Sequence, residues 1–518
     1  MVCHLERLTL ALFFSVVVAL SLFLLKNPDF GFHLKAGEYI WSTWSIPDRD
    51  VFSYLAAGNR WVDSHWLFQL VLYGVYSVAG IPGIILLRIS VLVAAFALLL
   101  ATVYRREYFA ISVFVGLLAL SNTFHRFVIR PELLSFLFLA AFFFLLERFS
   151  RHPRLSLIAI PLLQVIWTNA HGLHILGVAF VGLYVLGDAL QVLAHRLVSA
   201  VSDPGIAPRE LRLKGYLVVL TCAALLPNAN GIDGILYPLA IFRELRSEVS
   251  WFPAISELVP PFLVYQPGMI EIVTFYKAFL VISALTWLGS IRRLRFAHAL
   301  LYAAFLYVSL LAYRNIALFA IVATPITVRN LHEALDHARG AVRFRLPTRM
   351  QAAAVTSLVM LFVAAGVWTV TVDGRFYKWM HWKRSFGVGV SKRYPAGVVE
   401  HLKSIDGNIF NGADIGGYLI WKLYPEKQVA LDGRWEVYGE SLSWLSGAYS
   451  DPAVFSLLVE RHDIAAVVLS RGSLWARRMG PWIRRSPGWK RTLVTPNAVV
   501  FERTDRFRRR SGPRGPSG

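Results

Sequence analysis

Apolar runs, each about as long as a lipid bilayer is thick, dominate this sequence. A helix crosses the hydrocarbon core with about 17–25 residues, and every backbone polar group there must be hydrogen-bonded within the protein. Helices meet this requirement, so the runs predict a polytopic α-helical membrane bundle. We expect about eleven transmembrane helices, at residues 8–25, 83–103, 108–122, 131–148, 155–170, 172–193, 214–227, 269–289, 296–312, 315–330 and 351–371.

The composition agrees with a membrane protein, because 56% of the residues are hydrophobic and only 16% are charged. The first run, 8–25, is long and lacks a small-x-small cleavage site, so we interpret it as an uncleaved helix rather than a signal peptide. Only two cysteines are present, Cys3 and Cys222, which excludes a disulfide framework and a cysteine metal site.

The net charge of +21 comes mainly from short loops between apolar runs. Positive residues collect in cytoplasmic loops, so these loops orient the chain and do not indicate a nucleic-acid partner. The apolar segment 65–79 decides the topology. All basic loops fall on one side of the membrane only if this segment lies along the outer membrane interface and does not cross the membrane. The N-terminus is then cytoplasmic, and the polar region after residue 372 is extracytoplasmic.

The polar remainder predicts a small α/β domain on the outer face. We expect residues 1–372, with an outer loop at 26–82, to form the membrane domain. Residues 373–505 form the extracytoplasmic domain, and 506–518 a basic disordered tail. Helical and strand-like runs alternate in the outer domain: 396–404, 408–411, 415–423, 427–431, 452–461 and 464–469, with a closing hairpin at 489–495 and 498–502.

The first outer loop carries more reactive groups than a connector requires. Asp29 and His33 are four residues apart, so they share one face of a helix. Asp29 could act as a general base or as a ligand for Mg²⁺ or Mn²⁺, with His33 as a second ligand; alternatively it caps the helix. His33, Asp63 and His65 are candidates for binding the substrate. His65 could also join His33 and Asp29 in a metal site, and Asp63 is also placed to cap the segment 65–79.

Two arginines are candidates for binding a phosphate group. Arg88 lies several residues inside the second predicted span, and Arg130 lies at the outer boundary of the fourth. Guanidinium groups bind phosphate through paired hydrogen bonds and keep their charge. The alternative is that these side chains extend to the membrane interface, which fits Arg130 better than Arg88.

Other outer turns carry side chains that suit a sugar. Trp167, Asn169 and His171 lie together in a turn between two predicted spans, where an aromatic ring and planar polar groups could hold a sugar ring. Asn169 and Gly172 are turn-forming residues, so the turn can also be explained without any function. Glu257, in the loop at 227–268, is a second carboxylate that could reach the same site.

Ten segments together resemble a known group of proteins: NPDFGFHLKAGEYI, IPDRDVFSY, WVDSHWL, IRPEL, WTNAHG, LPNANG, ISEL, YRNIALFA, NGADIGGYLIWKLYP and LDGRWEVYG. They resemble a poorly characterised group of bacterial membrane proteins, similar to the C-type glycosyltransferases that use polyprenyl-phosphate sugars. The resemblance implies a helical bundle whose outer-loop aspartate, here Asp29, is a catalytic base or metal-associated carboxylate. It also implies a lipid phosphate near Arg88 and Arg130. Characterised relatives often carry a second acid where Phe30 stands here.

We therefore expect an inverting membrane glycosyltransferase of the bacterial inner membrane, acting on its extracytoplasmic face. The donor would be a polyprenyl-phosphate sugar entering from the membrane lipid, and the acceptor a lipid, a glycan or a protein. The alternative is a non-catalytic protein that binds or transports lipid-linked glycans or serves as a scaffold. Polar residues gather at one face instead of lining a path across the membrane, which favours a site over a transport route.

Overall fold

The computed structural model describes residues 2–198, 205–244, 256–341, 364–372, 374–380, 384–439 and 441–505, with residues 357 and 361. The chain forms two compact units. Unit 1 combines Met1–Leu24 with Ile81–Val388, and unit 2 combines Leu25–Gly80 with Gly389–Gly518. The first outer loop therefore shares its contacts with the C-terminal region. The boundaries expected at residues 372 and 505 stay predictions, and the expected tail lies outside the described residues.

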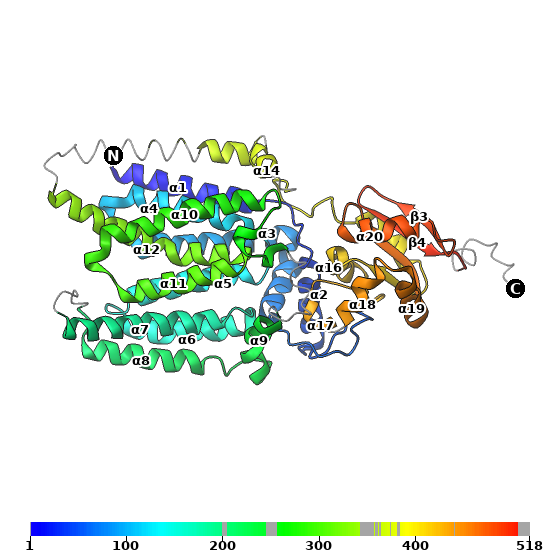
Figure 1. The fold of residues 1–518 in the computed structure, drawn as a ribbon, viewed down its shortest axis with the longest axis horizontal. Coiled ribbons are helices and arrows are strands. Elements are labelled where there is room, and N and C mark those ends of the chain that lie inside the picture. The colour runs from blue at the N-terminus through cyan, green and yellow to red at the C-terminus, as the bar shows by residue number, and fades with distance from the viewer. Residues whose placement is uncertain are drawn as a thin grey trace. The chain divides into compact units, whose positions relative to one another are not determined.

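Unit 1 is a bundle of helices that lie side by side (Figure 1). Their sequences are rich in leucine, alanine and phenylalanine, which pack into a dry interior. α7 packs against α8 and α11, while α12 packs against α4, α10 and α11. The helices are α1 (Val2–Ser21), the second part of α3 (Trp66–Val103), α4 (Phe109–Thr123), α5 (Glu132–Glu147), α6 (Pro153–Ala170), α7 (Ile175–Leu197), α8 (Pro208–Ala223), α9 (Gly231–Glu244), α10 (Met269–Ser290), α11 (Phe296–Leu311), α12 (Ile316–Ala341) and the short α14 (Arg375–Trp379).

The described helices support the expected membrane bundle in part. Helices also form where further spans were expected, as α5, α6, α8, α11 and α12. The count of about eleven stays a prediction, and most of the expected span at 351–371 lies outside the described residues. Among the described residues, four segments are long and apolar enough to cross a membrane: Trp66–Val103, Arg106–Arg126, Ile175–Leu197 and Met269–Ser290.

α3 contains a break at Gly80. The backbone there has φ 58° and ψ −151°, which is not helical, and Pro82 follows inside the helix. Glycine adopts a positive φ without strain because it has no Cβ. The break separates the segment expected at the interface, 65–79, from the span expected at 83–103. The boundary between the two units falls at the same place.

Unit 2 contains a four-stranded sheet in the order β1-β2-β4-β3. β1 (Asn408–Asn411) runs parallel to β2 (Ile464–Ser470). β4 (Ala498–Arg503) runs antiparallel to both β2 and β3 (Trp489–Val494). These strands form where the sequence predicted them, including the closing hairpin. The buried side chains of β2 and β4 form the centre of the domain core.

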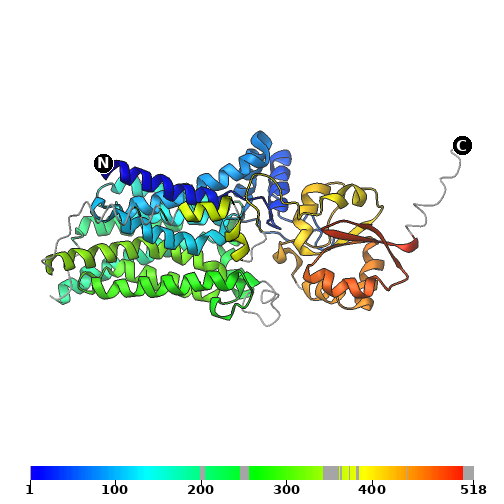
Figure 2. The ribbon, with the colours of Figure 1, turned by 90° about the horizontal axis from the view of Figure 1, so that it is seen from above.

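Helices cover both faces of this sheet (Figure 2). The predicted helices at 415–423 and 452–461 form as α16 and α19. The predicted strand-like run 427–431 forms only a single bridge, between Val429 and Ser53 of the first loop. The helices of unit 2, not all of which lie on the sheet, are α2 (Phe30–Thr43), the first part of α3, α15 (Val399–Lys403), α16 (Ala413–Leu423), α17 (Trp435–Tyr438), α18 (Ser441–Ala448), α19 (Pro452–His462) and α20 (Leu474–Ile483).

α2 of the first loop packs closely against α16. A Cβ at Gly31 would lie 2.1 Å from the carbonyl oxygen of Gly417, and a Cβ at Gly417 would lie 2.2 Å from that of Pro28. Both contacts are with backbone, which cannot move aside easily, so only glycine allows the two helices to approach this far. This contact fixes the start of α2, where Asp29 lies.

A buried ion-pair cluster also ties the loop to the C-terminal region. Arg434 pairs with Asp50 of the loop at 2.7 Å and with Asp432 at 2.7 Å. Its guanidinium also lies over the rings of Trp61 and Phe52, with centroid distances of 4.6 and 5.1 Å. Breaking a buried pair of this kind costs roughly 3–5 kcal/mol, so the cluster joins the two segments of unit 2 firmly.

Candidate active site

Asp29 occupies the N-cap position of α2, but its side chain makes no capping hydrogen bond. Its backbone is in the αR region, with φ −84° and ψ −16°, whereas a capping residue usually has an extended backbone. A Cβ at Gly433 would lie 2.2 Å from Oδ1 of Asp29, so the half-buried carboxylate lies directly against this glycine. The alternative role as a helix cap therefore does not account for the side chain.

Tyr394 supports the segment that carries Asp29. Its hydroxyl donates to the carbonyl oxygen of Asn27 at 2.5 Å, and the side-chain oxygen of Asn27 accepts from the amide of Asp29 at 3.2 Å. Burial and, second, the negative charge of Asp29 raise the pKa of Tyr394 above its ordinary value. The phenol therefore stays protonated and positions the loop as a hydrogen-bond donor.

Three other candidates from the first loop lie together. Buried Asp63 accepts from the amide of His65 at 3.1 Å and from the side chain of Gln69 at 3.0 Å. The same Gln69 nitrogen lies 3.5 Å from Nδ1 of His33, and the rings of His33 and His65 are 5.6 Å apart. Burial raises the pKa of Asp63 to about 7, despite these hydrogen bonds. The cluster orders the start of α3.

The sequence suggested Asp29 and His33 as possible metal ligands. Among the described residues, no group of three or more His, Cys, Asp or Glu side chains is arranged to hold a metal ion. Protein sites for Mg²⁺ or Mn²⁺ use several oxygen ligands. The ligand pair Asp29 and His33 stays a prediction, and no step of the reaction proposed below depends on a metal.

Arg88 is a buried cation inside unit 1, with 1% of its surface exposed. Its Nη2 donates to the carbonyl oxygen of Phe23 at 2.8 Å, and its guanidinium lies 4.0 Å from the centroid of the Phe23 ring. The remaining nitrogens, Nε and Nη1, have no hydrogen-bond partner among the described residues. Leaving charged donors buried without an acceptor is costly, so these two nitrogens point to a ligand.

A second guanidinium, from Arg384, lies over the same phenylalanine ring, 4.3 Å from the centroid of Phe23. Arg384 donates to the carbonyl oxygens of Phe124 and His125 at 3.1 and 2.8 Å. Two guanidinium groups beside one ring repel each other, so their shared position favours a bound anion. We call Arg88 and Arg384 the arginine pair.

Further buried polar groups lie near the arginine pair. Tyr377 interacts electrostatically with both arginines, and its hydroxyl has no hydrogen-bond partner among the described residues. The same is true of both ring nitrogens of His125. Sequence reasoning missed Arg384 and Tyr377, because they follow the last expected span in a stretch with no motif.

Arg130, the other predicted phosphate ligand, has an acidic partner. Arg130 contacts both oxygens of Glu257, at 2.8 and 3.1 Å, and Arg126 pairs with Glu257 and Glu132. Burial would raise the pKa of Glu257, but the guanidiniums of Arg126, Arg130 and Arg314 outweigh it and hold the pKa well below its ordinary value. The structure thus brings two predicted residues, Arg130 and Glu257, together as an ion pair.

The predicted sugar-binding turn is bonded internally. Trp167 is fully buried and donates to Ser135, whose hydroxyl lies 2.7 Å from Nδ1 of His171. Asn169 donates to the carbonyl oxygen of Pro227 and accepts from the amide of Ala229. These bonds hold the end of α6 against neighbouring segments, which is a structural role. A sugar contact from these three residues stays a prediction.

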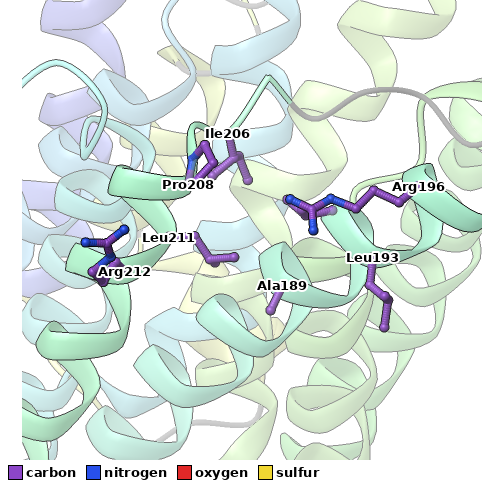
Figure 3. A pocket seen from close by; sticks show the side chains of 8 residues that line it. Ala189, Leu193, Arg196, Ile206, Pro208, Leu211 and Arg212 are labelled. Carbon is purple, nitrogen blue, oxygen red and sulfur yellow. The ribbon is translucent and has the colours of Figure 1, made fainter.

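A separate cavity of about 380 Å³ lies between the end of α7 and the start of α8 (Figure 3). Arg196 and Arg212 border it, and its remaining lining is apolar. It offers no carboxylate, hydroxyl or imidazole for chemistry. The cavity is therefore not the candidate active site.

The fold resembles those of two proteins of known structure. Archaeal oligosaccharyltransferase AglB from Archaeoglobus fulgidus, in complex with an inhibitory peptide and a dolichol-phosphate, matches with a TM-score of 0.56 and 12% identity over 89% of this chain and 69% of that one. ArnT from Cupriavidus metallidurans in the apo state matches with a TM-score of 0.53 and 14% identity, over 96% and 97% of the two chains. ArnT bound to undecaprenyl phosphate matches at 0.51.

No protein-family model matches the sequence, and no curated protein matches it. The structural likeness confirms the C-type glycosyltransferase fold that the sequence predicted: a helical membrane bundle with a small C-terminal α/β domain. At 12–14% identity, the likeness establishes the fold alone.

Proposed function

We propose that this protein is a membrane glycosyltransferase that moves a sugar from a polyprenyl-phosphate donor to an acceptor hydroxyl on the extracytoplasmic face. The bond between the sugar's anomeric carbon and the phosphate oxygen breaks. A new bond forms between that carbon and the acceptor oxygen. The acceptor proton goes to Asp29, and the polyprenyl phosphate leaves with the negative charge.

The observation that carries this proposal is the arginine pair. Arg88 keeps two buried donors without an acceptor among the described residues, and Arg384 adds a second positive charge at the same ring. A phosphate group would supply hydrogen-bond acceptors for the donors of Arg88 and a negative charge opposite both guanidinium groups. Its oxygens accept bidentate hydrogen bonds from guanidinium. Arg88 would hold the donor phosphate, and Tyr377 would donate a further hydrogen bond.

Stabilising the departing phosphate is the larger requirement of this reaction, because negative charge grows there as the sugar leaves. Preorganised cationic groups in a site that excludes water act strongly on such charge. Loss of one such group typically reduces the rate by about 100-fold to 1,000-fold. We therefore assign the greater share of the rate acceleration to Arg88 and Arg384.

Asp29 is the proposed base. Its carboxylate makes no capping bond and lies at a half-buried position, so it combines access with a fixed location. A base must lie within hydrogen-bonding distance of the proton that it accepts. The glycine at 433 and the hydrogen bond from Tyr394 to Asn27 hold this segment in place.

The lipids named with the structural neighbours support the choice of donor. The AglB structure is a complex with a dolichol-phosphate, and one ArnT structure is bound to undecaprenyl phosphate. Both are polyprenyl phosphates, which is the chemistry that the arginine pair would bind. We place the protein in a bacterial inner membrane with unit 2 outside, because the basic loops of the sequence collect on the opposite side.

The test is transfer of a radiolabelled sugar from a polyprenyl-phosphate donor to a mixed acceptor pool by the purified protein. Wild type should transfer label, and Asp29→Asn should reduce the rate by at least about 100-fold, because the isosteric amide cannot accept the proton. Equal rates would remove Asp29 from the mechanism. Lipid binding with no transfer by wild type would favour the non-catalytic lipid-glycan binding protein.

A further inference from the structure

A groove of about 580 Å³ crosses unit 2 and is separate from the arginine pair. Three segments form it: residues 390–397, the end of α16, and the turn between β3 and β4. The basic, aromatic and amide side chains of its lining are those of Lys392, Tyr394, Tyr418, Trp421, Lys422 and Asn497. It is open to one side and large enough for several sugar rings or a similar ligand.

Aromatic rings form the floor of the groove. The rings of Tyr394 and Tyr418 stack with centroids 4.6 Å apart and planes 12° apart. Trp421 stands at 82° to Tyr418, and it is only half-buried, so part of the indole remains accessible. Flat apolar surfaces with polar edges suit the faces of sugar rings, whose hydroxyl groups project sideways.

The groove is positively charged. Its lining includes two lysines, Lys392 and Lys422, and no carboxylate. Among the described residues, neither lysine forms an ion pair, and the Lys422 ammonium lies 3.5 Å from the centroid of the Trp421 ring. Burial lowers the pKa of Lys422, and repulsion from Lys35 and Lys403 lowers it further. A negative ligand would relieve this repulsion.

The same groups connect the groove to Asp29. Tyr394, which lines the groove, donates to the carbonyl oxygen of Asn27, two residues before Asp29. Gly417, next to Tyr418, lies against the carbonyl oxygen of Pro28. The groove floor and the proposed base are therefore held by one set of backbone contacts within unit 2.

We infer that this groove binds an anionic saccharide, a sugar chain carrying carboxylate or phosphate groups, as the acceptor of the transfer. The acceptor role rests on the proposed function, whereas the binding of an anionic saccharide does not. In the reaction, a hydroxyl of the saccharide loses its proton to Asp29 as its oxygen bonds to the anomeric carbon and the bond to the lipid phosphate breaks. Lys392 and Lys422 hold the charged groups, and Trp421 contacts a ring.

The experiment measures saccharide binding to the full-length protein in detergent by calorimetry, with no donor lipid present. The probes are tetragalacturonic acid and a phosphorylated mannotetraose, each beside its neutral counterpart, the methyl ester and the unphosphorylated sugar. At least one anionic probe should bind, at least about 10-fold more tightly than its neutral counterpart, and added salt should reduce the difference. Lys392→Gln and Lys422→Gln should each weaken that binding by about 10-fold.

The matched control is Lys490→Gln, which removes an exposed lysine of β3 outside the groove and should leave the affinity unchanged. The inference is overturned if neither anionic probe binds, if neutral and anionic probes bind alike, or if Lys490→Gln has the same effect as the groove variants. Charge-dependent binding in a protein that transfers no sugar would leave the groove assignment standing and contradict only the proposed transfer.

Discussion

Two groups of arginines in unit 1 have opposite surroundings. Arg126 and Arg130 meet the carboxylates of Glu132 and Glu257. Arg88 forms no ion pair with a carboxylate among the described residues, and its buried Nε and Nη1 have no hydrogen-bond acceptor among them. In the first group the protein supplies the counter-charge, so the arginines stabilise the fold. For Arg88, the described residues supply no counter-charge, and a ligand can provide it.

The comparison predicts that matched substitutions affect different properties. Arg126→Gln leaves the buried carboxylate of Glu132 and the half-buried carboxylate of Glu257 short of a partner, so we expect the free energy of unfolding to fall by about 3 kcal/mol. Denaturation with increasing mole fraction of SDS measures this change. A loss below about 0.5 kcal/mol would mean that this group does not hold the fold together.

Arg88→Gln should act on the reaction instead. We expect transfer to fall by about 100-fold, equivalent to about 2.7 kcal/mol, because one cationic group at the leaving phosphate is lost. The free energy of unfolding should change by less than about 1 kcal/mol, since removing an uncompensated buried charge offsets the lost contacts with Phe23. Steady-state kinetics and SDS denaturation on the same preparation check both. A strongly destabilised variant would place Arg88 with the structural arginines.

Arg384→Gln tests whether the second arginine of the pair contributes less to transfer than Arg88. Its guanidinium already donates to two backbone carbonyls, so it has fewer donors left for a ligand than Arg88. We expect transfer to fall by about 10-fold, equivalent to about 1.4 kcal/mol. Arg151→Gln, at an exposed position, is the matched control and should transfer sugar at the wild-type rate. A larger loss in Arg384→Gln than in Arg88→Gln would reverse the assigned roles.

Asp63 makes the stability of the fold depend on pH. Burial raises the folded-state pKa from 3.8 to about 7, so the folded protein prefers the protonated acid. This group therefore favours folding at low pH, and its ionisation costs stability as the pH rises from about 4 to about 7. Asp63→Asn should be more stable than wild type above pH 7, with the advantage disappearing near pH 4. A constant difference across this range would contradict the raised pKa.

Much of the fold could be predicted from the sequence, because its signals are local. Apolar runs predicted most of the described helices of unit 1, but not α9 or α14, and short β-rich segments predicted all four strands at nearly their observed bounds. The run 427–431 was different: its pairing partner, Ser53, lies more than 300 residues earlier in the chain. The grouping of the first loop with the C-terminal region depends on equally distant pairs, such as Asp50 with Arg434.

The candidate site was predictable in its chemistry but not in its partners. Arg88 was identified because a charge inside an apolar run is unusual. Arg130 looked similar, and only the structure shows that Glu257 neutralises it across 127 positions of sequence. Arg384 and Tyr377 carry no periodicity or motif, so nothing local marks them. Counter-charges come from tertiary contacts, and a single sequence does not display those contacts.

The most direct test of the central claim is native mass spectrometry of the purified protein after incubation with undecaprenyl phosphate. The wild-type protein and Arg151→Gln should each retain one lipid at low micromolar concentrations. Arg88→Gln should retain at least about 10-fold less at the same lipid concentration, because the phosphate loses its bidentate partner. Equal retention by all three proteins would show that Arg88 does not bind the phosphate and would contradict the account.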